Sequence, residues 1–340
     1  MRWRCQALDM VKGSCYALSM MPLETLLLVP VGLALLPGPA ARVGSSYLAP
    51  DGETATIRAV RESAHGHMTV IEKGSYRLLV VNGIVQTGIP RDISWLRKGY
   101  CLDINYFQEL LPYTVKKPEK TNALIIGLAG GMTASMLKLH GVQVHSVDLD
   151  PEIIALAREH FCFTGPAVAA DGRRYLEDCA EKYDFCVIDT YSGDVFPFHL
   201  ASREAFEAAR RVLKPGGILA LNYIGSPKGR AFACTHLTLE AVFRNVLAIG
   251  FEPGDAEQTI TLFASGRPIE FNGRWLDDSG DFTGIDTVGE AIDRLTLKPA
   301  RKDAFVLTDD YNPIDFLRAG EALRWRERTT AKIIGEGAIF

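Results

Sequence analysis

The amino-acid sequence predicts an α/β protein in which a parallel sheet with helices on both faces follows a small β-rich N-terminal domain. Two patterns predict this class. From Asn122 onward, short apolar runs alternate with helix-like segments at the spacing of strand–helix–strand units. Before them, β-branched runs from Met68 and Tyr76 are separated by the turn residues Lys73-Gly74-Ser75, as in a hairpin.

Length, charge and cysteine content narrow the possible partners. At roughly 150 residues per domain, 340 residues predict about two domains with a sizeable core. Lys and Arg number 37 against 41 Asp and Glu, so there is no basic field to bind nucleic acid. The seven cysteines include no CxxC pair, which favours reduced thiols over a disulfide framework or a zinc site. We therefore expect neither a metal site nor a nucleic-acid partner.

Residues 1–44 form a leader whose role the sequence leaves open. Thr25–Ala41 is an uncharged, mostly apolar run, shorter than the ~20 residues that cross a membrane, and it contains three prolines. The long segment before it and the flanking Glu24 are atypical of a signal peptide. An atypical signal or membrane anchor, a flexible leader and a packed helix remain as interpretations. The chain is expected in the cytoplasm, with membrane association or export through residues 25–41 as alternatives.

The N-terminal domain is predicted over residues 45–105. Ser45–Asp51 is small and turn-rich, so it is predicted as a linker. The strands of the hairpin begin at Met68 and Tyr76, and the segment IVQTG from Ile84 continues the β pattern.

Residues 106–340 are predicted as the second domain, and its helices have recognisable ends. Asp150 and Pro151 are typical of an N-cap and a first helical residue, so a helix is expected to continue to Phe161. A second helix is expected near residues 173–180. A third is expected over residues 202–213, ended by Lys214-Pro215-Gly216-Gly217.

The strands of this domain are short apolar runs between the helices. Five parallel strands are predicted: Ala123–Gly127, Val142–Asp150, the run ending at Asp171, Phe185–Asp189 and the run from Ile218. Beyond Phe251, QTITLFAS from Gln258 is expected to add antiparallel strands to the same sheet.

Acidic or glycine-rich groups follow the first four strands. Ligands bind outside the carboxyl ends of parallel strands, so these positions are candidate binding residues. They are the turn Gly127-Leu128-Ala129-Gly130-Gly131, then Asp148 with Asp150, then Asp171-Gly172, and finally Asp189. Asp148 follows Gly127 at the spacing that brings a carboxylate to a ribose diol. The ordered set predicts a nucleoside-binding, Rossmann-like sheet of the class I methyltransferase type.

The glycine-rich turn restricts the nucleoside. Ala129 and Met132 stand where a dinucleotide-binding GxGxxG has its second and third glycines, so NAD is disfavoured. The chain has no GxxxxGK[ST] motif, which excludes a P-loop. Adenosyl compounds such as S-adenosylmethionine and its decarboxylated form remain, because they carry no pyrophosphate.

The segment from about Ser63 to Ser265 resembles the spermidine synthase (polyamine aminopropyltransferase) family, and most closely its divergent bacterial spermidine synthase-like branch. Members of that branch often carry an N-terminal signal or membrane segment. The motifs that carry the resemblance are HGHMTVIEKG, LLVVNGIVQTG, LIIGLAGG, SVDLDPEIIALARE, ADGRRYLE and YDFCVIDTYSGDVFPFHL, with LTDDYNPID beyond them.

The resemblance implies a role for each candidate residue. It implies decarboxylated S-adenosylmethionine as co-substrate, no tightly bound cofactor, a putrescine-like amine as acceptor and a homodimer. Asp189 would be the general base. The co-substrate would be bound by the turn and the first acidic strand ends: Gly127, Gly130, Gly131, Asp148, Asp171 and Gly172. The amine would be bound by Gln86, Tyr106, Tyr191 and Asp194.

The chain departs from the family pattern at two carboxylates. Gly130 stands where the family's turn has an aspartate that binds the aminopropyl ammonium. Ser192 stands where the loop after the fourth strand has a second aspartate for the diamine, although Asp194 follows two residues later. Selection for the decarboxylated co-substrate is therefore expected to be weaker, because a turn carboxylate would repel the intact one.

The chemistry implied is a displacement at carbon. A primary amine attacks the methylene next to a sulfonium, methylthioadenosine leaves as a neutral thioether, and a carboxylate takes the proton. Two alternatives remain open: a methyltransferase that uses intact S-adenosylmethionine, and a nucleoside- or polyamine-binding homologue without turnover. Ile125 stands where methyltransferases usually carry an acid before the turn, which argues against the first. Loss of the acid at Gly130 favours the second.

Overall fold

The structure is a computed structural model. It describes residues 42–92, 107–193, 195–250, 256–272, 292 and 295–334. Two predicted amine-binding residues, Tyr106 and Asp194, lie outside these ranges, as does the apolar run 25–41. Within the described ranges, no helix is both long enough and apolar enough to cross a membrane.

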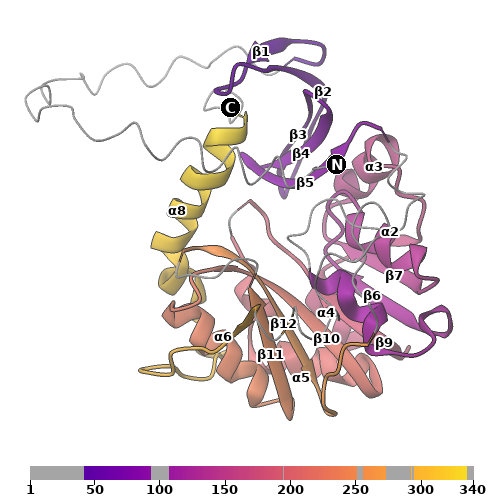
Figure 1. The fold of residues 1–340 in the computed structure, drawn as a ribbon, viewed down its shortest axis with the longest axis vertical. Helices are drawn as coiled ribbons and strands as arrows, with labels where there is room; N and C mark the ends of the chain where they lie inside the picture. The colour runs from indigo at the N-terminus through magenta and orange to yellow at the C-terminus, as the bar shows by residue number, and fades with distance from the viewer. Residues whose placement is uncertain are drawn as a thin grey trace, which may run out of the picture. The chain divides into compact units, whose positions relative to one another are not determined.

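The N-terminal part is an antiparallel sheet of five strands in sequential order (Figure 1). The strands are β1 (Ser46–Leu48), β2 (Thr54–Ser63), β3 (Gly66–Lys73), β4 (Tyr76–Val81) and β5 (Ile84–Pro90). The β3–β4 hairpin confirms the prediction from Met68 and Tyr76. The prediction of a linker over Ser45–Asp51 is wrong in part, because β1 pairs with β2 there. A strand of three residues is too short to show the alternation of polar and apolar residues that marks a strand, so the sequence did not predict it.

The second sheet has eight strands in the order β13-β11-β12-β10-β9-β6-β7-β8. β8, β7, β6, β9 and β10 are parallel neighbours, whereas β12, β11 and β13 are antiparallel. The strands are β6 (Asn122–Ile126), β7 (Gln143–Asp148), β8 (Ala167–Ala169), β9 (Tyr183–Ile188), β10 (Leu213–Gly225), β11 (Asn245–Gly250), β12 (Gln258–Ser265) and β13 (Thr296–Leu297). This is the predicted Rossmann-like sheet, with the antiparallel addition at Gln258 confirmed.

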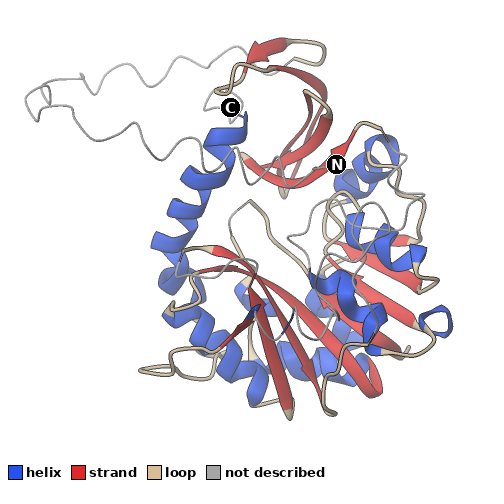
Figure 2. Cartoon of the chain, in the orientation of Figure 1, coloured by secondary structure: helices blue, strands red, loops and turns tan. Residues whose placement is uncertain are grey.

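Helices cover both faces of this sheet (Figure 2). They are α2 (Met132–Leu139), α3 (Pro151–His160), α4 (Gly172–Asp178), α5 (Arg203–Val212), α6 (Arg230–Glu240) and α8 (Ile314–Ile334), with the 3-10 helices η2 (Phe107–Thr114), η3 (Pro118–Lys120) and η4 (Phe198–Leu200). The cap predicted at Asp150 is present, and Asp171 is the N-cap of α4. Asp150 accepts from the Glu152 N–H at 2.9 Å and Asp171 from the Arg174 N–H at 2.8 Å.

One predicted boundary differs. The helix predicted over residues 202–213 is α5, which ends one residue earlier, at Val212, and β10 begins at Leu213 and includes the Lys214–Gly217 turn residues. The pairing of β10 with β9 shifts register between Leu213 and Ile218, and Gly216 has a φ of +77° there. The turn residues therefore bulge the strand instead of preceding it.

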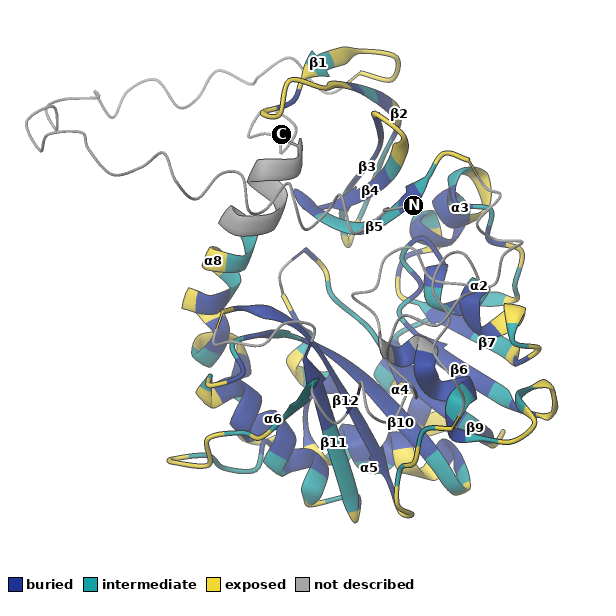
Figure 3. Cartoon of the chain, viewed as in Figure 1, coloured by how far each residue is buried: buried dark blue, intermediate teal, exposed yellow. Residues whose placement is uncertain are grey.

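Alternation along the central strands decides which side chains meet the helices. In β9, Cys186 and Ile188 pack in the core with α4, α5 and α6, whereas Phe185 and Val187 pack with α2, α3 and η2. Both faces are buried, as the dark strands of Figure 3 show. Because side chains alternate, the residue after Ile188 is directed to the side of α2 and η2. That residue is Asp189.

The N-terminal sheet shares a core with the Rossmann-like part. Its inward side chains, among them Met68, Leu79 and Ile89, pack against Met132 of α2 and Leu156 of α3. This contact brings β5 over the beginning of α2, where the glycine-rich turn lies.

Candidate active site

The turn from β6 to α2 requires glycine at its first position. Gly127 has a φ of +93°, and a Cβ there would lie 1.8 Å from the backbone oxygen of Asp189. The turn is held on both sides, since the Gly127 N–H donates to Val147 O and the Asp189 N–H donates to Ile126 O. Gly131, with a φ of +76°, is the N-cap of α2. The ends of β6, β7 and β9 are thus in close contact.

Thr87 of β5 packs against the glycine-rich turn at Gly130. The Gly130 N–H donates to Thr87 Oγ1 at 3.0 Å, and a Cβ on Gly130 would lie 2.6 Å from Thr87 Cγ2. The space that an aspartate side chain at residue 130 would need is therefore filled by Thr87, a buried residue of the N-terminal sheet. This contact gives a physical reason for glycine at 130.

We expect Gly130→Ala to lower the melting temperature. The added methyl group would overlap the Thr87 methyl, and overpacking of this kind costs about 1–3 kcal/mol. Thr87→Ser in the same chain should recover most of the loss, because it removes the methyl group in closest contact and keeps the hydroxyl that accepts from the Gly130 N–H. Thermal denaturation of the two single variants and the double variant checks this; additive losses would contradict it.

Asp148, at the end of β7, holds the same turn. Its Oδ2 accepts from the Leu128 N–H at 2.8 Å, and its Oδ1 accepts from the Asp150 N–H at 3.0 Å. Burial raises the pKa of this carboxyl, while the backbone N–H groups oppose the shift. Asp148 is therefore both a structural acceptor of the turn and the carboxylate that the sequence assigns to a ribose.

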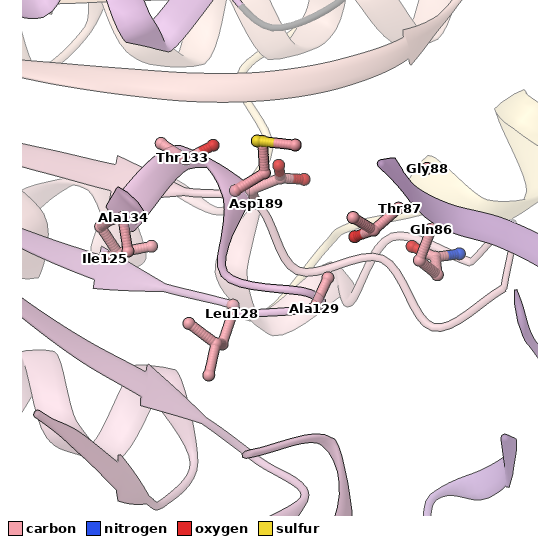
Figure 4. Close-up of a pocket in the computed structure, with 11 residues that line it drawn as sticks. Gln86, Thr87, Gly88, Ile125, Leu128, Ala129, Thr133, Ala134 and Asp189 are labelled. Atoms are coloured by element: carbon pink, nitrogen blue, oxygen red, sulfur yellow. The ribbon is translucent and has the colours of Figure 1, made fainter. Parts of the chain in front are cut away.

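Asp189 lines a pocket with Gln86 and Thr87 of β5 and with Met132 and Thr133 of α2 (Figure 4). Its Oδ1 accepts from Asn222 Nδ2 at 2.8 Å and its Oδ2 from Gln108 Nε2 at 3.2 Å. Burial raises the pKa of Asp189 to about 6, although the two amides lower it. The pocket therefore presents a carboxyl group that changes charge near neutral pH.

The other predicted residues lie around this pocket or away from it. Gln86 lines it and donates to the Gly193 backbone oxygen at 2.9 Å. Tyr191 is not among the lining residues; its hydroxyl accepts from the Ile224 N–H at 2.7 Å, beneath the Arg318 guanidinium. Burial raises the pKa of Tyr191 to about 12, so its hydroxyl remains protonated.

Asp171 and Gly172 lie at the end of β8, outside the lining of that pocket. Asp171 caps α4 through Oδ1, and its Oδ2 lies 3.3 Å from His199 Nε2. A Cβ on Gly172 would lie 2.3 Å from Ile126 Cγ2, so this glycine allows α4 to approach β6. The adenine role expected for this pair stays a prediction.

Sequence reasoning missed Thr87, Gln108 and Asn222. Asn222 did carry a signal, since it is a polar residue inside the apolar run ILALNYI. Thr87 and Gln108 carried none, because their importance depends on contacts with residues far along the chain. Within the described ranges, no group of His, Cys, Asp and Glu side chains is arranged to hold a metal ion.

Comparisons with known proteins identify the fold and the sequence relatives of this chain. Residues 124–221 match the family described as "Methyltransferase domain". A probable polyamine aminopropyl transferase of Bifidobacterium longum is 30% identical over 146 residues, 41% of this chain and 33% of that protein. Polyamine aminopropyltransferase 2 of Hyperthermus butylicus is 30% identical over 193 residues, 50% of this chain and 57% of that protein. The chain thus matches less than two thirds of either relative.

Among solved structures, a probable spermidine synthase from Corynebacterium glutamicum aligns with a TM-score of 0.53 at 18% identity. The alignment covers 82% of this chain and 94% of that one. The class I methyltransferase-like Rossmann fold is therefore confirmed, as is the sequence resemblance to polyamine aminopropyltransferases.

Proposed function

We propose that this chain is an aminopropyltransferase that moves the aminopropyl group of decarboxylated S-adenosylmethionine to a primary amine such as putrescine. The observation that carries the proposal is Asp189, which lines a pocket at the carboxyl end of β9 and has a pKa raised to about 6. The sequence relatives named polyamine aminopropyltransferase support the same reaction class.

The reaction needs alignment and one proton acceptor. The amine nitrogen forms a bond to the methylene carbon, the carbon–sulfur bond breaks, and its electron pair goes to sulfur, which becomes a neutral thioether. The amine's proton goes to Asp189. An alkylammonium has a pKa of about 10.4 and an ordinary Asp a pKa of about 3.9. A pKa of about 6 makes Asp189 a stronger base than an ordinary Asp and reduces the difference in pKa between the proton donor and the acceptor.

The nucleoside side is assigned to the glycine turn and the neighbouring strand ends. Gly127, Gly130 and Gly131 would let the co-substrate approach the backbone, and Asp148 would accept the ribose hydroxyls. Both Asp148 oxygens already accept one backbone N–H, and each carboxylate oxygen has a second acceptor site. Asp171 with Gly172 would contact the adenine.

We expect Asp148→Ala to weaken methylthioadenosine binding by roughly ten- to a hundredfold, the usual effect of losing a charge-assisted hydrogen bond. Asp184→Ala is the matched control. Asp184 also accepts a backbone N–H, that of Asn122 at 2.9 Å, but it lies at the opposite end of β9. Calorimetry on both variants checks the assignment, and unchanged affinity in Asp148→Ala would contradict it.

A methyltransferase that uses intact S-adenosylmethionine is the second candidate. It is favoured by the match to the methyltransferase domain and by Gly130 and Thr87, which leave the turn without a carboxylate to repel the intact co-substrate. A nucleoside- or polyamine-binding protein without turnover is the third.

The product of a single incubation separates these candidates. The purified chain is mixed with putrescine and either decarboxylated or intact S-adenosylmethionine, and the products are identified by mass spectrometry. Aminopropyltransferase activity yields methylthioadenosine and spermidine. S-adenosylhomocysteine with a methylated amine would support the second candidate, and binding without any product would support the third.

A further inference from the structure

Four polar side chains form a continuous chain of hydrogen bonds at one face of the sheet. Asp189 directly follows β9, while Asn222 and Thr261 lie within the neighbouring strands β10 and β12, where they are paired directly with each other. Their apolar neighbours alternate to the other face, so all three are directed toward η2. Gln108 of η2 completes the chain.

Each carboxylate oxygen of Asp189 accepts from a different amide. Asn222 and Gln108 are 2% and 0% exposed, so both amides are enclosed by protein. Thr261 donates its hydroxyl hydrogen to Gln108 Oε1 at 3.2 Å, which orients the Gln108 amide with its N–H toward Asp189. Two fixed donors on two oxygens leave the carboxylate little rotational freedom.

The Asn222 amide is held in this orientation at a cost to the fold. Its nitrogen faces Asp189, and its carbonyl oxygen is buried with no hydrogen-bond partner among the described residues. An unpaired buried acceptor is unfavourable, so a fold selected for stability alone would place an apolar residue here, in the middle of ILALNYI. Packing therefore does not explain Asn222, whereas its hydrogen bond to Asp189 does.

We propose that Gln108 and Asn222 form an amide clamp, a pair of positioning residues that holds both oxygens of Asp189 and keeps its remaining lone pairs available for the proton of the attacking amine. This inference rests on the proposed function for the identity of the amine. The clamp itself transfers no proton. It stabilises the ionised carboxylate, which is the form able to act as a base, and it fixes the direction of proton transfer.

Isosteric variants test the clamp without changing its shape. Gln108→Glu and Asn222→Asp each replace the N–H donor by a second carboxyl group beside Asp189. Because two adjacent carboxyl groups resist losing both protons, the pair should lose its last proton at least one pH unit above the titration of Asp189 in the wild-type chain, and the Asp189 signal should show that step. Gln108→Met removes the donor without adding charge and should give a smaller upward shift.

The measurement is a ¹³C NMR titration of aspartate carboxyl groups, with the Asp189 signal assigned from its loss in Asp189→Asn. Ser146→Ala is the control, since Ser146 is buried in β7 and its hydroxyl has no hydrogen-bond partner in the described part of the chain. It should leave the titration unchanged. In an assay of aminopropyl transfer, the pH below which the rate falls should be higher in the variants than in the wild-type chain, with the same ranking of variants as in the titration.

A titration of Asp189 that coincides in the wild-type, Gln108→Glu and Asn222→Asp chains would overturn the clamp. Where the two acidic variants do not fold, the same comparison is made with Gln108→Met, and an unchanged titration there has the same meaning. Because the titration does not need turnover, absence of any amine product would overturn the proposed function while a shifted titration still supported the clamp.

Discussion

Replacing Asp189 by Asn should reduce aminopropyl transfer by roughly 10²–10⁴-fold, which is the usual contribution of a general base. Asn keeps the size of the side chain and one acceptor for the amides of Asn222 and Gln108, but it cannot take the amine's proton. Methylthioadenosine affinity should stay within about twofold, because the nucleoside is assigned to Asp148 and the turn. Turnover close to that of the wild-type chain would remove Asp189 from the role of base.

The same substitution should not destabilise the fold at alkaline pH. The folded-state pKa of about 6 lies above the unfolded value of about 3.9, so the folded chain binds this proton more tightly. Stability from this group is therefore present at low pH and is lost as the pH rises through about 4 to 6. Above that range Asp189→Asn removes a buried charge, which favours folding, but leaves one of the two amide donors without an acceptor, which opposes it. The melting temperature at pH 8 should therefore stay within about 3 °C of the wild-type value, and a larger drop would indicate a structural role instead.

Gly127→Ala should have the largest effect on stability. Its Cβ would lie 1.8 Å from the Asp189 backbone oxygen, and its φ of +93° is unfavourable for alanine. Both problems involve the backbone, so rotating a side chain relieves neither of them. The ends of β6 and β9 must therefore move apart at the pocket. We expect a loss of about 3–5 kcal/mol, or roughly 10 °C in melting temperature, together with loss of methylthioadenosine binding.

Ala129→Gly is the matched control in the same turn. Ala129 has a φ of +46°, so glycine relieves strain there while adding freedom to the unfolded chain, and the net change should stay within about 1 kcal/mol. If Gly127→Ala melted at the same temperature as the wild-type chain, the close contact described between the ends of β6 and β9 would be contradicted.

The fold was predictable because its signals are local. Strands such as β6 and β9 are short apolar runs buried on both faces, and Asp150-Pro151 marks the beginning of α3 within two residues. The edge strand β1 was missed since its pairing with β2 depends on residues outside its own segment.

The site was predictable only in its strand ends. Asp148 and Asp189 follow apolar runs, so their place at the carboxyl edge follows from the sheet alone. The contacts that hold the turn and Asp189 in place do not follow from the sheet. Thr87 meets Gly130, and Gln108 meets Asp189, across long stretches of chain. Such pairs depend on how β5 and η2 pack on the sheet, which neither composition nor periodicity encodes.

The dependence of kcat/KM on pH tests the proposed base most directly, with putrescine and decarboxylated S-adenosylmethionine as substrates. If Asp189 deprotonates a bound ammonium, the wild-type rate should fall below about pH 6 and stay level from there to the amine's own pKa of about 10.4. Asp189→Asn can use only amine that is already neutral in solution, so its residual rate should climb tenfold per pH unit across the same range. A wild-type rate that climbs in this way, with no level region above pH 6, would contradict the assignment of Asp189 as the base.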